Sequence, residues 1–166
     1  ETADLANYRL HGLCVSAEMD LPELQSAVLP GNTPADVAVL YGEVPERIPD
    51  ATESEEGFQV NGPAVLIDTG EGARFLVECG TRITAQKDGD TPVELMRLFL
   101  YGAAFSAALQ QRRLMALHAS AAVFNGQAIA FAGPAQHGKS TLVAALGALG
   151  YPILADDKIV VTPSGD

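Results

Sequence analysis

The sequence predicts an α/β fold, α+β overall, in which a small β-rich N-terminal domain and a connecting helix precede a strand–loop–helix–strand segment. Three observations predict this order. Short apolar runs separated by turn residues fill the first half, a stretch with helical spacing follows, and a glycine-rich loop then separates an apolar run from a second helix. The boundaries fall at residues 1–90, 91–113 and 114–166.

The composition is that of a globular protein that avoids polyanions. Of the 166 residues, 48% are hydrophobic and 19% are charged, which provides enough apolar material for a core. The net charge of −11 predicts no nucleic-acid partner and no membrane partner. No apolar run of about 18 residues and no export signal is visible, so we expect a cytoplasmic protein in which Cys14 and Cys79 are buried free thiols.

The N-terminal region reads as a series of short strands. Gly, Pro, Asn and Asp residues punctuate it at regular intervals, which favours a small and mostly antiparallel sheet. The acidic stretch at 50–56 is expected to be a solvated loop. The predicted strands span 8–15, 36–41, 58–60, 64–68, 74–78 and 81–86.

A change of period marks the connecting helix at 91–113. Thr91 is placed as its N-cap, Pro92 as its first helical residue, and Glu94 three residues after the cap. Apolar residues then recur at steps of three and four, which is more typical of a core-facing stripe than of a cofactor site. The stripe consists of Leu95, Leu98, Phe99, Ala103, Phe105, Ala108 and Leu109.

The last region begins with a predicted β-hairpin. Two apolar runs are separated by Asn125-Gly126, the strongest short-range hairpin signal. The second run leads into the glycine-rich loop, and the loop leads into a helix that Gly150 ends. We expect strands at 114–124, 127–132, 151–155 and 159–162, and the helix at 142–149.

The glycine-rich loop matches the phosphate-binding pattern G-x-x-x-x-G-K-[ST] at every fixed position. Backbone N–H groups of such a loop surround phosphate oxygens, and the N-terminus of the following helix adds its dipole. Lys139 provides a charge for the β- and γ-phosphates, and Ser140 provides a hydroxyl for Mg²⁺. The expected ligands are ATP, or a similar nucleotide, and Mg²⁺. The nucleotide-binding residues are Gly133, Pro134, Ala135, Gln136, His137, Gly138, Lys139, Ser140 and Thr141.

Three other side chains are candidates for chemistry. Asp156 and Asp157 follow an apolar strand, where carboxylates can hold Mg²⁺ or accept a proton from a hydroxyl. Acidic pairs at such places also begin turns or cap helices, so both interpretations stay open. His118 lies in an apolar run, and a lone histidine there is more often a hydrogen-bonded core residue than a functional one.

These motifs together resemble a known family. The stretch LHAS at 117–120, the loop at 133–141 and the stretch GYPILADD at 150–157 are similar to the catalytic domain of HPr kinase/phosphorylase and its relatives. That domain shares its P-loop architecture with phosphoenolpyruvate carboxykinase. The resemblance covers residues 115–161, with three motifs in the family's order and spacing.

The resemblance implies a role for each matching residue. Asp156 is similar to the general base that takes a proton from an acceptor serine, and Asp157 would assist with metal or orientation. Lys139 would bind the transferred phosphate, Ser140 would ligate Mg²⁺, and His118 is similar to the active-site histidine of the family. The family's further acidic metal ligand and substrate loop would lie beyond Asp166, so we expect the gene product to be longer.

The implied activity is that of an ATP-dependent serine kinase. Residues 1–90 do not match the N-terminal domain of HPr kinases, which favours another protein or peptide acceptor. Related kinases phosphorylate a serine of ribosomally made precursor peptides such as lasso peptides. Relatives form hexamers, so a homo-oligomer is a further expectation, and the reverse phosphorylase reaction stays open. Two alternatives remain: a non-catalytic nucleotide sensor or assembly module, and a small-molecule phosphotransferase.

Overall fold

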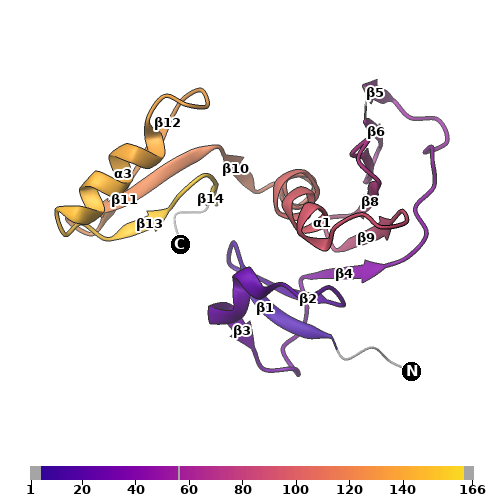
Figure 1. Cartoon of the computed structure of the whole chain (residues 1–166), viewed down its shortest axis with the longest axis horizontal. Coiled ribbons are helices and arrows are strands. Elements are labelled where there is room, and N and C mark those ends of the chain that lie inside the picture. Colours follow the sequence, from indigo (N-terminus) through magenta and orange to yellow (C-terminus); the bar gives the residue numbers. More distant parts are fainter. Residues whose placement is uncertain (1–4, 56, 163–166) are drawn as a thin grey trace. The chain divides into compact units, whose positions relative to one another are not determined.

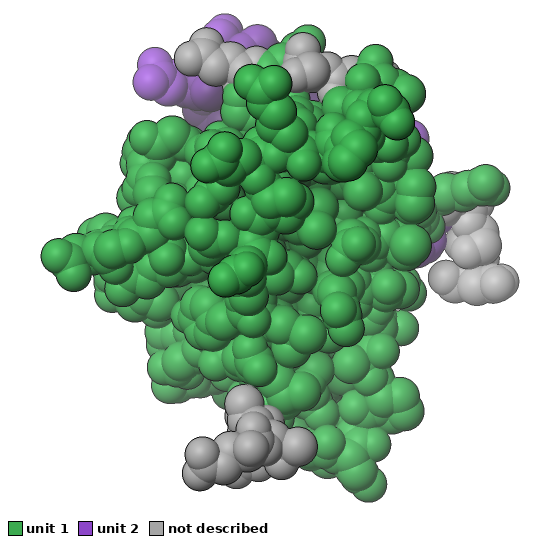
Figure 2. Space-filling model, turned by 90° about the vertical axis from the view of Figure 1, so that its right-hand side faces the viewer, with its two compact units in different colours: residues 1–113 green, residues 114–166 purple. Residues whose placement is uncertain are grey.

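A computed structural model of the chain describes residues 5–55 and 57–162. It divides into two compact units, Glu1–Arg113 and Leu114–Asp166 (Figures 1 and 2). The fold is mixed α/β with many strands and few helices, as the sequence predicts, and the helical segment belongs to the first unit. Over these two ranges, no helix combines the length and the apolar character needed to cross a membrane.

The described part of unit 1 contains a nine-stranded sheet in the order β3-β1-β2-β4-β9-β8-β7-β6-β5. Strands β2 and β9 each pair with β4 in parallel, and the other pairs are antiparallel, so the sheet is mostly antiparallel as predicted. A short 3₁₀ helix, Pro22–Ala27, precedes β3. The strands are β1 Ala6–Leu10, β2 Leu13–Ala17, β3 Val28–Leu29, β4 Val37–Tyr41, β5 Glu53–Glu55, β6 Phe58–Asn61, β7 Ala64–Asp68, β8 Ala73–Glu78 and β9 Arg82–Lys87.

The single strand predicted at 8–15 is wrong, because the chain turns back within it. Strands β1 and β2 form a hairpin whose two-residue turn is His11-Gly12. Both turn residues have positive φ, 52° and 80°, which matches the twist that two-residue hairpin turns require.

The solvated loop predicted at 50–56 is also wrong in part. Glu53–Glu55 forms the edge strand β5, which pairs with β6 in antiparallel register. Charged residues are typical of an exposed edge, where they discourage pairing with other chains. Glu56, the last residue of the predicted loop, lies outside the described residues.

The helical segment packs against the sheet with a face that matches the predicted stripe in α2, where Phe105, Ala108 and Leu109 are buried, but differs from it in α1. It consists of α1 Val93–Phe99, the π-helical turn η2 Leu100–Ala104 and α2 Phe105–Gln111. Leu98, expected in the core, is 65% exposed. A π turn holds an extra residue, so the buried faces before and after it do not follow one helical period. The buried residues of the segment are Met96, Leu100, Ala104, Phe105, Ala108 and Leu109.

The predicted cap of this helix is wrong as well. The Thr91 hydroxyl lies 2.7 Å from the carbonyl oxygen of Asp88 and 2.8 Å from that of Gly72, so it ties two loops together and does not cap the helix. Glu94 instead pairs with Arg97 at 3.6 Å. The expectation for the cysteines holds for Cys14, which is buried, and fails for Cys79, which is exposed in the turn after β8.

Unit 2 contains a three-stranded sheet in the order β12-β11-β13, and a separate pair, β10 with β14, all antiparallel. The strand predicted at 114–124 is interrupted at His118, because its two halves pair with different partners. The hairpin at Asn125-Gly126 is confirmed, and both residues have positive φ, 50° and 76°. The elements are β10 Met115–Leu117, β11 Ala119–Phe124, β12 Gln127–Ala132, α3 Lys139–Ala148, β13 Ile153–Ala155 and β14 Ile159–Val161.

Candidate functional site

The glycine-rich loop connects β12 to α3, as the phosphate-binding pattern requires. Gly138 is the N-cap of α3 and has φ 78°, a left-handed conformation that glycine adopts without strain. Gln136 is also left-handed, with φ 66°. Gly133 does not have a left-handed φ, and a Cβ at this position would meet no atom within 4 Å. Glycine is therefore not needed here for its backbone conformation, and its small size leaves room for a ligand to approach the loop. Left-handed residues within a loop curve the backbone so that N–H groups converge.

The Lys139 side chain folds back over this loop. Its Nζ donates to the carbonyl oxygens of Gly133, at 2.9 Å, and Pro134, at 3.0 Å. The His137 ring contacts the carbonyl oxygen of Ala135 at 2.9 Å, while its side chain remains exposed. The positive charge of Lys139 and the N-terminus of α3 therefore act on the same small volume, which favours an anion there.

A hollow of about 370 Å³ lies against the loop. The P-loop forms most of its wall, and two residues from other parts of unit 2 complete it. It is lined by His118, Ala135, Gln136, Gly138, Lys139, Ser140, Thr141 and Asp157. Gly133, Pro134 and His137, all predicted to bind nucleotide, do not line it, and neither does Asp156.

Asp156 directly follows β13 and is exposed. The Ser120 hydroxyl, from fully buried Ser120 on β11, donates to Asp156 Oδ1 at 2.5 Å. This hydrogen bond is the main reason why the pKa of Asp156 lies below its usual value, and the nearby Ser140 hydroxyl and the charge of Lys139 lower this pKa further. The carboxylate thus lies beside two residues of the P-loop.

Asp157 and His118 form a second contact of the site. Asp157 has φ 77°, which an aspartate tolerates better than most residues, and the chain turns there between β13 and β14. His118 Nδ1 lies 3.1 Å from Asp157 Oδ1 and 3.0 Å from the Asp157 carbonyl oxygen. The His118 side chain is 54% exposed, so it is not the buried core histidine that lone histidines usually are.

The structure places part of the predicted set around one hollow, leaves Asp156 outside its lining, and adds one residue that the sequence interpretation passed over. Ser120 belonged to the LHAS stretch, but no role was given to it. Its signal in the sequence is that it is the single polar residue of Ala119–Phe124, ASAAVF. A hydroxyl in the middle of a buried strand needs a partner, and that partner is Asp156.

Oxygen atoms are the potential metal ligands of the site. Within residues 5–55 and 57–162, no group of three or more His, Cys, Asp or Glu side chains is arranged to hold a metal ion. Ser140 lies beside Asp156, whereas Asp157 lies beside His118, so the two predicted metal ligands, Ser140 and Asp157, have different neighbours. A hydroxyl and a carboxylate, together with phosphate oxygens, form the kind of set that Mg²⁺ uses with nucleotides.

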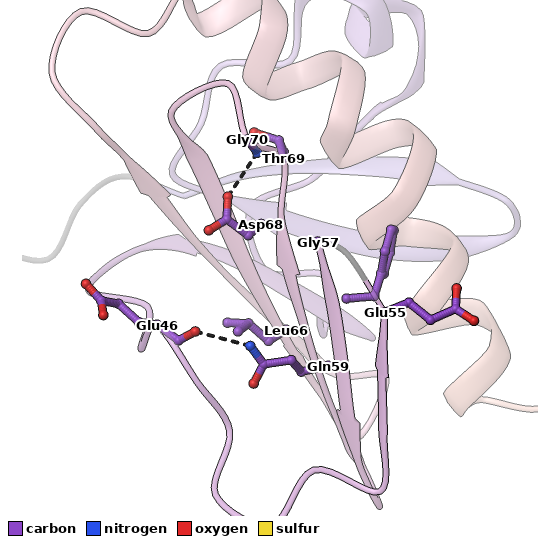
Figure 3. Close-up of a pocket in the computed structure, with 9 residues that line it drawn as sticks. Glu46, Glu55, Gly57, Gln59, Leu66, Asp68, Thr69 and Gly70 are labelled. Carbon is purple, nitrogen blue, oxygen red and sulfur yellow. Dashed lines mark hydrogen bonds between the residues drawn. The ribbon is translucent and has the colours of Figure 1, made fainter.

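Unit 1 contains a larger hollow, of about 500 Å³, with opposite chemistry (Figure 3). Its polar lining includes the carboxylates of Glu46, Glu55 and Asp68, and the described residues around it include no Lys, Arg or His. Gly70 N–H donates to Asp68 at 2.9 Å, and Gln59 donates to the Glu46 carbonyl at 3.2 Å. The hollow at the P-loop is the candidate functional site, because Lys139 and the N-terminus of α3 favour an anion there.

Comparison of the chain with protein-family models, with curated proteins and with solved structures gives no match. The function is therefore inferred from the motifs of the sequence and from the geometry of this site.

Proposed function

We propose that this chain is an ATP-dependent serine kinase of the HPr kinase/phosphorylase type, with a P-loop domain similar to that of phosphoenolpyruvate carboxykinase. It would transfer the γ-phosphate of ATP to a serine hydroxyl of a protein or peptide. One observation carries the proposal: the Ser140 hydroxyl and the Lys139 charge of the P-loop both lower the pKa of the Asp156 carboxylate, so this carboxylate is within electrostatic reach of the loop. A proton acceptor is thus close to the residues that would hold the terminal phosphate.

The loop supplies the binding of the nucleotide. Its backbone N–H groups and the N-terminus of α3 attract the phosphates, and Lys139 exchanges its contacts with Gly133 and Pro134 for contacts with the β- and γ-phosphates. That exchange costs little, because both carbonyl oxygens are near the exposed surface and can accept hydrogen bonds from water. Mg²⁺, when bound with the nucleotide between Ser140 and a carboxylate of the Asp pair, would neutralise phosphate charge.

Transfer requires that a serine hydroxyl lose its proton as it attacks. Asp156 accepts this proton while the serine oxygen forms a bond to the γ-phosphorus. The bond between that phosphorus and the bridging oxygen breaks, and ADP leaves with the bond's electron pair. Lys139 stabilises the negative charge on the phosphate oxygens during the transfer. Asp156 is ionised at neutral pH, as aspartates ordinarily are, and its lowered pKa keeps the carboxylate in the unprotonated form that a general base requires.

Asp157 and His118 orient the acidic pair. The contact of His118 with both the side chain and the carbonyl oxygen of Asp157 fixes the left-handed turn that follows Asp156. A fixed turn keeps the Asp156 carboxylate at the loop, and accurate positioning of a base is worth more than its intrinsic strength. The acceptor is a serine in a protein or peptide, with ribosomally made precursor peptides as the class that the resemblance favours.

The test compares two neighbouring carboxylates by the same conservative change. Asp156→Asn is expected to lower phosphate transfer by about 10²- to 10⁴-fold while Mg·ATP binding stays within a few-fold, because only the proton acceptor is lost. Asp157→Asn is expected to have a smaller effect on transfer, and Lys139→Ala to lose binding itself. Calorimetry measures binding, and γ-labelled ATP with serine-containing peptides, proteins and small alcohols measures transfer.

Each result assigns the protein to one class. Labelled peptide or protein supports the kinase, labelled small alcohols would make the chain a small-molecule phosphotransferase, and nucleotide binding without any transfer would make it a sensor. Full transfer by Asp156→Asn contradicts the role of Asp156. Absence of Mg·ATP binding by the folded wild-type chain would falsify the proposal as a whole.

A further inference from the structure

A one-residue irregularity in the sheet of unit 2 determines which side chain lies opposite Ser120. Strands β11 and β13 pair through Ala122 with Ile153, but then through Ala121 with Ala155, so Leu154 is an extra residue on β13. The register after this bulge places Asp156 across from Ser120. Without the bulge, the same register would place Ala155 there. Bulges next to active sites re-aim side chains in this way.

The environment of Ser120 differs from that of its partner. Ser120 is fully buried between Ala119 and Ala121, which are fully buried as well, whereas Asp156 is exposed. A buried hydroxyl needs a hydrogen-bond partner, and the Ser120 hydroxyl donates to Asp156 Oδ1 at 2.5 Å. Strand β11, which pairs with β12 on one side and β13 on the other, thus holds one oxygen of an exposed carboxylate.

We propose that Ser120 is a positioning residue, which anchors the carboxylate of Asp156 to the sheet so that it faces the P-loop. The kinetic consequence of this inference rests on the proposed kinase function, whereas the anchor itself rests on geometry alone. Ser120 does not touch substrate. A hydrogen bond to a charged acceptor is among the stronger ones in proteins, and a charge-assisted O–H donor fixes direction as well as distance.

The experiment uses the full chain and three substitutions. Ser120→Ala removes the donor, Ser120→Thr keeps the hydroxyl, and Ser16→Ala makes the same deletion at a buried strand position of unit 1 that has no part in the site. Ser120→Ala leaves no buried polar group behind, because Asp156 can bind water, so the fold should survive. Hydrogen–deuterium exchange verifies that the fold survives, in unit 2 for the Ser120 variants and in unit 1 for Ser16→Ala.

The kinetic result expected of Ser120→Ala is a fall in kcat of about tenfold with the KM for ATP unchanged within about twofold, because orientation of the base is lost and nucleotide binding is not. Ser120→Thr should recover most of kcat, and Ser16→Ala should match the wild type. An unchanged kcat in Ser120→Ala, or an equal fall in Ser16→Ala, overturns the positioning role. A rise in KM alone overturns it too, since it would assign Ser120 to nucleotide binding.

A spectroscopic measurement separates this inference from the proposed function. The anchored Ser120 hydroxyl proton should exchange slowly enough with water to give its own NMR resonance, which is absent from Ser120→Ala. The resonance should broaden or disappear in Asp156→Ala and persist in Asp157→Ala. If the wild-type chain transfers no phosphate, the kinase proposal fails while this spectrum still decides whether the anchor exists. Persistence of the resonance in Asp156→Ala overturns the anchor.

Discussion

The two units of this chain differ in where their apolar residues lie. In unit 1, both the sheet and the helical segment contribute fully buried side chains, among them Phe75, Ile83, Leu100 and Phe105. In unit 2, large side chains are mostly exposed, and Ala119, Ala121, Ala122 and Val143 make up its buried apolar set. The large apolar residues exposed in unit 2 are Met115, Phe124, Ile129, Leu142, Leu149, Ile153, Leu154 and Val161.

This difference separates stability from chemistry. A unit that buries large side chains gains most of the hydrophobic free energy, whereas a short unit built around alanines gains little of it. The residues proposed to act in unit 2 lie in loops, in the first turn of α3, or at or near the ends of strands, where N–H groups, hydroxyls and carboxylates can be presented together. The loop of the candidate site is shaped mainly by its backbone conformation, whereas the fold of unit 1 is stabilised mainly by side-chain packing.

The largest effect on stability is expected in the core of unit 1. Phe75→Ala should lower the free energy of unfolding by about 3 to 5 kcal/mol, because Phe75 is fully buried and the cavity it leaves cannot be filled. Phe58→Ala serves as the matched control, since Phe58 on β6 is 44% exposed, and should cost about 1 kcal/mol or less. Hydrogen–deuterium exchange of the unit 1 strands measures the loss of unfolding free energy in both variants. Equal losses would contradict the assignment of the core.

A smaller effect, of backbone origin, is expected in the P-loop. Gly138→Ala should cost about 1 to 2 kcal/mol, because φ at this position is 78° and a Cβ is strained there although it would meet nothing within 4 Å. Gly31→Ala has equally open space but no positive φ, and should leave stability unchanged or raise it by up to about 1 kcal/mol. Thermal unfolding of the two variants, followed by hydrogen–deuterium exchange in each unit, compares their stabilities. A neutral Gly138→Ala would show that the loop does not depend on the left-handed conformation.

Much of the fold follows from local sequence signals. The strands at Ala64–Asp68 and Gln127–Ala132 and the Asn125-Gly126 turn follow the prediction, because their signals lie within a few residues. The predictions failed where pairing partners, near or far in the chain, decide the structure. Glu53–Glu55 is a strand because the neighbouring β6 pairs with it, and Thr91 does not cap the helix because its hydroxyl donates to the carbonyls of Gly72 and Asp88.

The candidate site shows the same limit. The P-loop pattern predicts its own structural setting, because a strand, a loop and a helix are contiguous in the chain. The neighbours of Asp156 could not be predicted, because its contact with Ser120 depends on a bulge at Leu154 that no local signal announces. The π turn at Leu100–Ala104 similarly changed which residues of a correctly predicted helical segment are buried.

The smallest effect tests the exposed apolar surface of unit 2. Leu149→Ser should change the free energy of unfolding by less than about 0.5 kcal/mol, because Leu149 is 76% exposed and already pays the cost of contact with water in the folded state. Val143→Ala, on the same helix, removes two buried methyl groups and should cost about 1.6 kcal/mol. Urea unfolding of both variants, followed by hydrogen–deuterium exchange of the α3 amides, compares their losses of unfolding free energy. A loss in Leu149→Ser as large as that in Val143→Ala would mean that the end of α3 is covered in solution, and that unit 2 buries more apolar surface than this chain alone provides.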